Sequence, residues 1–207
     1  MRSMGFTKQA GRRSFWDMGL FYRDGALEAT ANDVLDEWEN QTVRVAVRTT
    51  VQFGANERVR LYIAHWRSRL TPNSDAHRTR AAQILRRTIE RDLAADVPVV
   101  VLADFNLEPF DGALVETLAS SRDPRLVLRH RREKLFNPTW SLAAPPSSDP
   151  WQAFGSISFK NTRWLFDQAL TSSHFLDDVS RIAPTVAILP PPHSNTADHD
   201  LLELTLP

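Results

Sequence analysis

Four groups of polar side chains in this sequence could do chemistry, and most of them lie where a short apolar run ends or begins. These groups are His65 after residues 61–64, Asp104 and Asn106 after 99–102, Asp167 within the apolar stretch 164–170, and Asp198 with His199 before 201–204. Carboxylate and amide oxygens suit Mg²⁺ or Mn²⁺ as ligands, and imidazoles transfer protons near neutral pH. Together these side chains predict metal-assisted hydrolysis.

Each group also has a purely structural interpretation. Asp104 and Asn106 are turn-forming residues after a strand, and a single histidine at a strand end is more often structural than catalytic. Asp167 is the hardest to explain in this way, because burying an ionised carboxylate without a partner costs several kcal/mol. It therefore needs a cation, an imidazolium or several hydrogen-bond donors. The four groups in this order favour the chemical interpretation.

The elements that must position these residues predict a layered α+β fold. Alternating apolar and polar residues predict a hairpin of strands at 43–51 and 59–65. Helical spacing predicts a helix over 73–93, and the unbroken apolar run 99–102 is typical of a strand buried on both faces. Further elements are expected as strands at 18–22, 156–159, 164–170, 185–189 and 201–206, a turn at 23–26 and a short helix at 111–118.

Composition limits the class of protein. The 207 residues suit one domain, and 25 basic against 25 acidic residues leave no net charge that would draw the chain to nucleic acid or an anionic membrane. The absence of cysteine excludes disulfides, thiolate zinc sites and a cysteine nucleophile. Without an apolar run of about 18 residues or a signal-peptide pattern, we expect a cytoplasmic protein and no membrane partner.

The order of the motifs resembles that of the endonuclease/exonuclease/phosphatase superfamily, the deoxyribonuclease I-like enzymes. The most specific part is 104–109, Asp-Phe-Asn-Leu-Glu-Pro, which is similar to the Gly-Asp-Phe-Asn box of the family with Ala103 in place of glycine. Residues 198–199 are similar to its Ser-Asp-His box, with Ala197 in the serine position. The resemblance implies a two-sheet sandwich flanked by helices and Mg²⁺-dependent (or Mn²⁺-dependent) hydrolysis of phosphoesters, of the nuclease type.

The resemblance also implies roles for the central residues. His199 would be the general base or a phosphate-stabilising imidazole, with Asp167 accepting its other ring N–H. Asp104 would orient the attacking water and bind metal together with Asp198. Asn106 would hold the water or a phosphate oxygen.

Other residues receive roles at the edge of this site. His65 would contact the phosphate or assist the leaving group, and Arg67 would contact the substrate phosphate. Asp17 is a candidate partner of His65. Trp66 and Trp140, with Arg69, could contact bases and phosphates, although tryptophan in a sandwich is more often part of the core.

The front of the family domain has no counterpart in this sequence. Family domains begin with a strand carrying asparagine and a second strand ending in the main metal-binding glutamate, and residues 1–16 contain neither residue type. We therefore expect a basic, poorly ordered lead-in at 1–16 and a domain at 17–207 that lacks its N-terminal strands. A gene model truncated at its start, a partner chain that completes the sheet, or a degenerate remnant would each explain this difference.

The missing glutamate leaves other functions open. A non-catalytic interaction module would keep the fold without the chemistry, and Mg²⁺ would then bind negligibly. An inositol-phosphate or sphingomyelin phosphoesterase is a further alternative, ranked last because no polybasic run or exposed aromatic hairpin favours a membrane surface.

Overall fold

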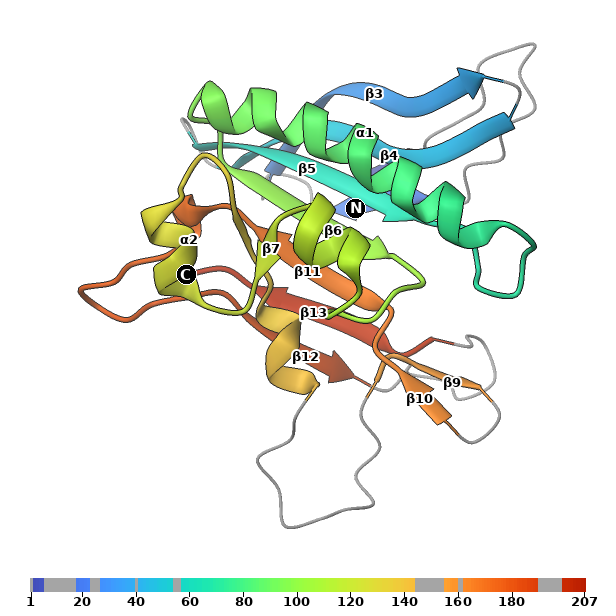
Figure 1. The fold of residues 1–207 in the computed structure, drawn as a ribbon. Coiled ribbons are helices and arrows are strands. Elements are labelled where there is room, and N and C mark those ends of the chain that lie inside the picture. The colour runs from blue at the N-terminus through green and yellow to red at the C-terminus, as the bar shows by residue number, and fades with distance from the viewer. Residues whose placement is uncertain are drawn as a thin grey trace.

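A computed structural model describes residues 2–5, 18–22, 27–39, 41–53, 57–143, 155–159, 162–189 and 199–207. Its largest element is a seven-stranded sheet with the strand order β3-β4-β5-β6-β11-β8-β7 (Figure 1). These strands are β3 (Leu27–Glu39), β4 (Gln41–Phe53), β5 (Glu57–His65), β6 (Val99–Asp104), β11 (Asp167–Thr171), β8 (Leu135–Phe136) and β7 (Ser120–Ser121). Three two-stranded sheets accompany it: β1 (Arg2–Gly5) with β2 (Gly19–Tyr22), β9 (Ile157–Phe159) with β10 (Thr162–Trp164), and β12 (Thr185–Leu189) with β13 (Leu201–Thr205).

Helix α1 (Ser74–Ala94) connects β5 to β6 and covers one face of the large sheet. Its buried residues Ala81, Leu85, Ile89 and Leu93 recur every four positions and so form one apolar stripe. This stripe packs in the main core, which also contains side chains of β4, β5 and β6. Because a helix crosses between them, β5 and β6 can run parallel, as they do.

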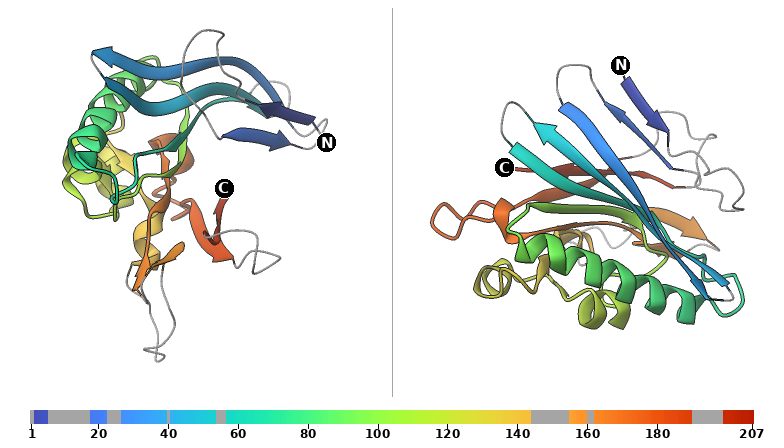
Figure 2. Two further views of the ribbon diagram at one scale, coloured as in Figure 1. Left: turned by 90° about the vertical axis from the view of Figure 1, so that its right-hand side faces the viewer. Right: turned by 90° about the horizontal axis from the view of Figure 1, so that it is seen from above.

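The opposite face of the large sheet carries a second, smaller core. Val51, Val59, Leu61 and Val100 are buried there, and Leu204 of β13 packs against them. Figure 2 shows α1 on one side of the large sheet and the β12–β13 hairpin on the other. The two-sheet sandwich with flanking helices confirms the α+β class that the sequence predicts.

The predicted hairpin, the long helix and the buried strand are confirmed as β4–β5, α1 and β6. The 13-residue strand β3 was not predicted, nor was α2 (Pro124–Arg129). The helix expected at 111–118 is a five-residue π-helical segment, η1 (Ala113–Thr117). Two short 3₁₀ helices, η2 (Pro138–Leu142) and η3 (Ser173–Phe175), complete the elements.

The start of the chain also differs from expectation. Residues 2–5, within the expected lead-in, form β1, which pairs with β2. The turn expected at 23–26 lies outside the described residues, and β2 pairs with β1 while β3 pairs with β4.

The single strand expected at 164–170 is wrong, because β10 and β11 are separate strands. The backbone between them bonds to the loop after β6: Phe105 N–H donates to Phe166 O at 2.9 Å. Leu165 N–H donates to Glu108 Oε1 at 3.1 Å. The first bond continues the register of β11 with β6 by one residue, and the second gives Leu165 N–H a side-chain partner in place of a strand. None of the helices in the described ranges is long and apolar enough to cross a membrane.

Candidate active site

The strand register brings three predicted residues together. His65 ends β5 and is paired with Asp104, which ends the parallel strand β6. Asp167 begins the antiparallel strand β11 and is paired with Asp104 from the other side. Since directly paired residues lie within about 5.5 Å of each other, His65, Asp104 and Asp167 form a row across three adjacent strands.

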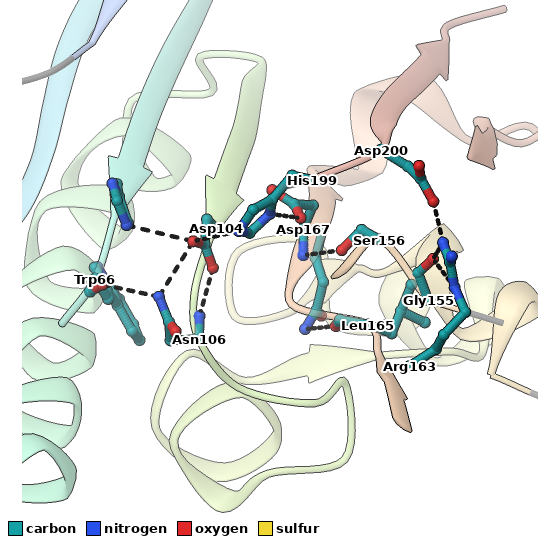
Figure 3. A network of polar contacts seen from close by, with 12 residues as sticks. Trp66, Asp104, Asn106, Gly155, Ser156, Arg163, Leu165, Asp167, His199 and Asp200 are labelled. Atoms are coloured by element: carbon teal, nitrogen blue, oxygen red, sulfur yellow. Dashed lines mark hydrogen bonds and ion pairs between the residues drawn. The ribbon is translucent and has the colours of Figure 1, made fainter. Parts of the chain in front are cut away.

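Asp104 stands at the centre of the polar cluster in Figure 3. Its Oδ2 atom lies 3.4 Å from His65 Nε2 and 3.9 Å from His199 Nε2. The other oxygen, Oδ1, accepts the backbone N–H of Asn106 at 2.9 Å. The carboxylate is therefore fixed by the chain that follows it, and its second oxygen faces the two imidazoles.

His199 and Asp167 form a close pair. The distance from His199 Nδ1 to Asp167 Oδ2 is 2.6 Å, within the range of a charge-assisted hydrogen bond. With Nδ1–H donated to the carboxylate, Nε2 of a neutral imidazole carries the lone pair that can accept a proton. That atom faces Asp104 (Figure 3).

Asn106 is held in a left-handed backbone conformation with φ of 51°, which asparagine tolerates better than most residues. Its Nδ2 atom donates to Trp66 O at 3.1 Å and to Asp104 Oδ2 at 3.1 Å. Both partners are acceptors, which assigns the nitrogen of the amide to this side. The amide oxygen Oδ1 is left as an acceptor.

The electrostatics of the cluster favour a cation. Burial raises the pKa of the Asp104 carboxyl, and the nearby charge of Asp167 raises it further. The Asn106 N–H, His65 and His199 act in the opposite direction on this pKa. Asp104, Asp167 and His199 each offer a ligand atom, and these atoms lie within 4.8 Å of one another. Two carboxylates and an imidazole fit a divalent ion.

A cavity of about 750 Å³ opens onto this cluster. Its polar lining comprises His65, Ser68, Asp104, Asn106, Asp167 and His199. Apolar side chains, among them Ile63, Leu102 and Leu202, line the remainder. The site is thus a mixed groove, with the reactive groups along one part and an apolar surface along the other.

Five of the predicted residues, His65, Asp104, Asn106, Asp167 and His199, meet in this cavity. Asp198 and Asp17 lie outside the described residues. Asp167 is half-buried at the start of β11, not in the middle of a strand as the sequence suggested. It has the imidazole partner that its burial requires.

Arg67, Trp66 and Trp140 lie outside the cavity lining. The side chain of Arg67 is exposed, and its carbonyl accepts from Arg78 Nη1 at 2.8 Å. Trp66 is 1% exposed, packs edge-on against Phe105 and donates from Nε1 to Val45 O at 2.9 Å. Trp66 is therefore a core residue. Trp140 packs edge-on against Phe110.

Arg69 and Glu108 support the loop that carries Asn106, a role that the sequence did not indicate. Arg69 Nε donates to Asn106 O at 2.9 Å, and Nη2 bonds Asp111 Oδ2 at 2.6 Å. The same guanidinium lies over the ring of Phe166, 4.9 Å from its centroid. Burial raises the pKa of Glu108, whose carboxylate accepts the Leu165 N–H. The Glu108-Pro109 pair after the Asp-Phe-Asn box was the signal available in the sequence.

Three solved structures illustrate the similarity of the fold. The human Nocturnin catalytic domain with bound sulfate has a TM-score of 0.54 and 17% identity, with 90% of this chain and 63% of that chain covered. Truncated Caenorhabditis elegans TDP2 has a TM-score of 0.57 and 15% identity, with 88% of this chain and 68% of that chain covered. The Bacteroides thetaiotaomicron mannosyl-6-phosphatase Bt3783 has a TM-score of 0.52 and 11% identity, with 91% of this chain and 70% of that chain covered.

At these identities the structures establish the fold alone, and the chain spans 63% of the Nocturnin domain. No curated protein matches the sequence. A family model, however, described as the Endonuclease/Exonuclease/phosphatase family, matches residues 7–202. Because this match extends over nearly the whole chain, the protein belongs to the endonuclease/exonuclease/phosphatase family.

Proposed function

We propose that this protein hydrolyses phosphoester bonds by metal-assisted attack of water, as a phosphodiesterase of the nuclease type. The observation that carries the proposal is the row of His65, Asp104 and Asp167 across three strands, closed by His199. The members of this family are generally phosphoesterases, and the structurally similar proteins include a phosphatase.

In this proposal His199 is the general base. Asp167 holds the imidazole in the tautomer whose Nε2 can accept a proton, as in other acid–histidine pairs. The 3.9 Å between His199 Nε2 and Asp104 Oδ2 is too long for a direct hydrogen bond and leaves the attacking water within reach of both atoms. The water gives its proton to Nε2 as its oxygen bonds to phosphorus.

The other residues complete the reaction. Asn106 has committed its amide hydrogens to Trp66 and Asp104, so its Oδ1 would accept from the water. His65, on the other side of Asp104, would protonate the oxygen that leaves phosphorus when the ester bond breaks. Asp104 and Asp198 are the proposed ligands of Mg²⁺ or Mn²⁺. When bound, such an ion stabilises the negative charge that develops on the phosphoryl oxygens.

The test is hydrolysis of bis-p-nitrophenyl phosphate, plasmid DNA and mannose 6-phosphate with Mg²⁺, Mn²⁺ or a chelator. We expect metal-dependent cleavage of the diesters and a loss of about 10²–10⁴-fold in kcat for Asp104→Ala and His199→Ala. Arg125→Ala, which removes an ion pair to Asp178 away from the cavity, is the control. Absence of metal-dependent hydrolysis of every substrate, or equal rates in wild type and both active-site variants, would refute the proposal. Cleavage of mannose 6-phosphate alone would keep the chemistry and reassign the substrate to monoesters.

A further inference from the structure

Arg163 of β10 and Asp200, the residue before β13, form an ion pair beside the catalytic cluster (Figure 3). Both side chains are largely buried, with 27% and 21% of their surfaces exposed. The same guanidinium donates to Gly155 O from Nε at 3.2 Å and from Nη2 at 2.6 Å. Arg163 thus links the carboxylate of Asp200, the residue after His199, to the backbone carbonyl of Gly155.

The neighbouring residue Ser156 bonds both Asp167 and Asp200, the residue that follows His199. Asp200 N–H donates to Ser156 O at 2.7 Å, and Asp167 N–H donates to Ser156 Oγ at 3.0 Å. Ser156 is fully buried, and its own N–H donates to Trp164 O at 2.8 Å. One fixed residue therefore determines where the segments of His199 and Asp167 lie relative to each other.

His199 needs such support because it precedes β13, which begins at Leu201. Within the described part of the chain, its backbone pairing is a single bridge to Ile157. The 2.6 Å bond to Asp167 depends on the position of the imidazole, and misplacement by about 1 Å can reduce catalysis about 10²-fold.

We infer that Arg163 and Asp200 are positioning residues that hold His199 against Asp167 through Gly155 and Ser156. Neither residue lines the cavity, so we expect neither to contact the substrate. Their loss should lower the fraction of molecules with a correctly placed imidazole and leave substrate binding unchanged. The inference rests on the proposed function, in which His199 is the base.

The kinetic test compares wild type with Arg163→Ala, Asp200→Ala and the double variant. We expect each to reduce kcat by about 10–100-fold, the usual effect of removing a partner that orients a functional histidine. KM should stay within about twofold. Because the two residues act as one unit, the loss of kcat in the double variant should be no larger than the loss in the less active of the two single variants. Arg163→Lys should recover part of the rate, since it keeps the charge without the planar fork. Arg125→Ala is again the control.

A second measurement needs no turnover. In one-dimensional proton NMR, the Nδ1 proton between His199 and Asp167 should give a low-field signal that Asp167→Asn abolishes. Arg163→Ala should weaken or remove this signal, while Arg163→Lys should retain part of it.

Unchanged kcat and an unchanged proton signal in Arg163→Ala would overturn the inference. So would a raised KM with unchanged kcat, because Arg163 would then bind substrate directly. If the wild type proves inactive, the proposed function fails, and the proton signal still decides whether Arg163 positions His199.

Discussion

At the scale of single residues, the charge of Asp104 is the central feature of the site. Its carboxyl is buried next to a second carboxyl, Asp167, and both effects raise its pKa. An arrangement that keeps two acids so close is electrostatically unfavourable unless a cation offsets it. A divalent ion bound at Asp104, as proposed above, would offset this repulsion.

Mn²⁺ affinity should increase with pH across the raised pKa of Asp104, because the carboxyl must lose its proton before it can bind the ion. Calorimetry in two buffers of different ionisation heat should detect release of a proton on the acid side of this range. Asp104→Asn should bind more weakly and lose most of this proton release. A wild-type affinity that does not vary with pH would contradict the expectation.

Glu108→Gln should stabilise the protein increasingly as pH rises. Burial raises the pKa of Glu108, opposed in part by the Leu165 N–H and Arg69. The protonated form is therefore favoured in the folded state, and the stability it contributes is lost as pH rises through the folded pKa. Glutamine keeps an oxygen for the Leu165 N–H and does not ionise.

Urea unfolding between about pH 4 and 8 measures the free energy of unfolding of Glu108→Gln relative to wild type. This difference should grow in favour of the variant as pH rises and then level off. Glu116→Gln, an exposed glutamate in the same connection, is the control. An advantage that is constant with pH, or that shrinks as pH rises, would show that the charge of Glu108 is not the cause.

At the scale of elements, the β9–β10 hairpin is the unit that connects Asp167 with His199. The hairpin begins next to Gly155, whose φ of 125° is a conformation that other residues rarely adopt. A Cβ atom at this position would lie 2.6 Å from Trp164 O and 2.8 Å from Trp164 N. Only glycine allows the two backbones to approach so closely.

Gly155→Ala should therefore destabilise the protein by at least about 1–3 kcal/mol, the usual cost of a strained backbone. It should also reduce kcat, because Gly155 O is the anchor of Arg163. Gly112→Ala is a matched control: its Cβ would meet nothing closer than Glu116 at 3.7 Å, so we expect a change within about 1 kcal/mol. Equal stabilities of the two variants in urea unfolding would contradict the prediction.

At the scale of the whole molecule, two cores share one large sheet. The main core under α1 is closed, with Leu85, Ile89, Tyr62 and Trp66 all at most 1% exposed. The second core is smaller and borders the cavity, since Ile63 and Leu102 pack against it and also line the groove. Stability thus resides mainly on the helix side of the sheet, and the site lies at its other face and edge.

Leu85→Ala should cost about 2–5 kcal/mol in the free energy of unfolding, because a cavity forms where the side chain is fully buried. Leu70→Ala, at a position 75% exposed, should change it by no more than about 0.5 kcal/mol. The same urea titration measures both. A Leu85 variant as stable as the Leu70 variant would show that α1 does not close the main core.

Local sequence patterns determined the elements whose residues repeat regularly. Alternation predicted β4 and β5, helical spacing predicted α1, and the apolar run predicted β6. Strand β3 was not predicted because charged and apolar residues mix along it. Its conformation depends on pairing with β4 over nearly its full length. The break at Leu165 and Phe166 was not predicted for a related reason. Their backbone bonds go to Glu108 and Phe105, which follow β6 and are distant in the sequence.

By itself the sequence determined which side chains are available and the order in which strands deliver them: His65, Asp104, Asn106, Asp167 and His199. Only the tertiary structure decided which atoms face one another. The parallel pairing of β5 with β6 and the antiparallel pairing of β11 with β6 place His65 and Asp167 on either side of Asp104. His65 and Asp167, more than a hundred positions apart in the sequence, meet there because strand register is a long-range property, set by packing across the sheet and not by neighbours in the chain.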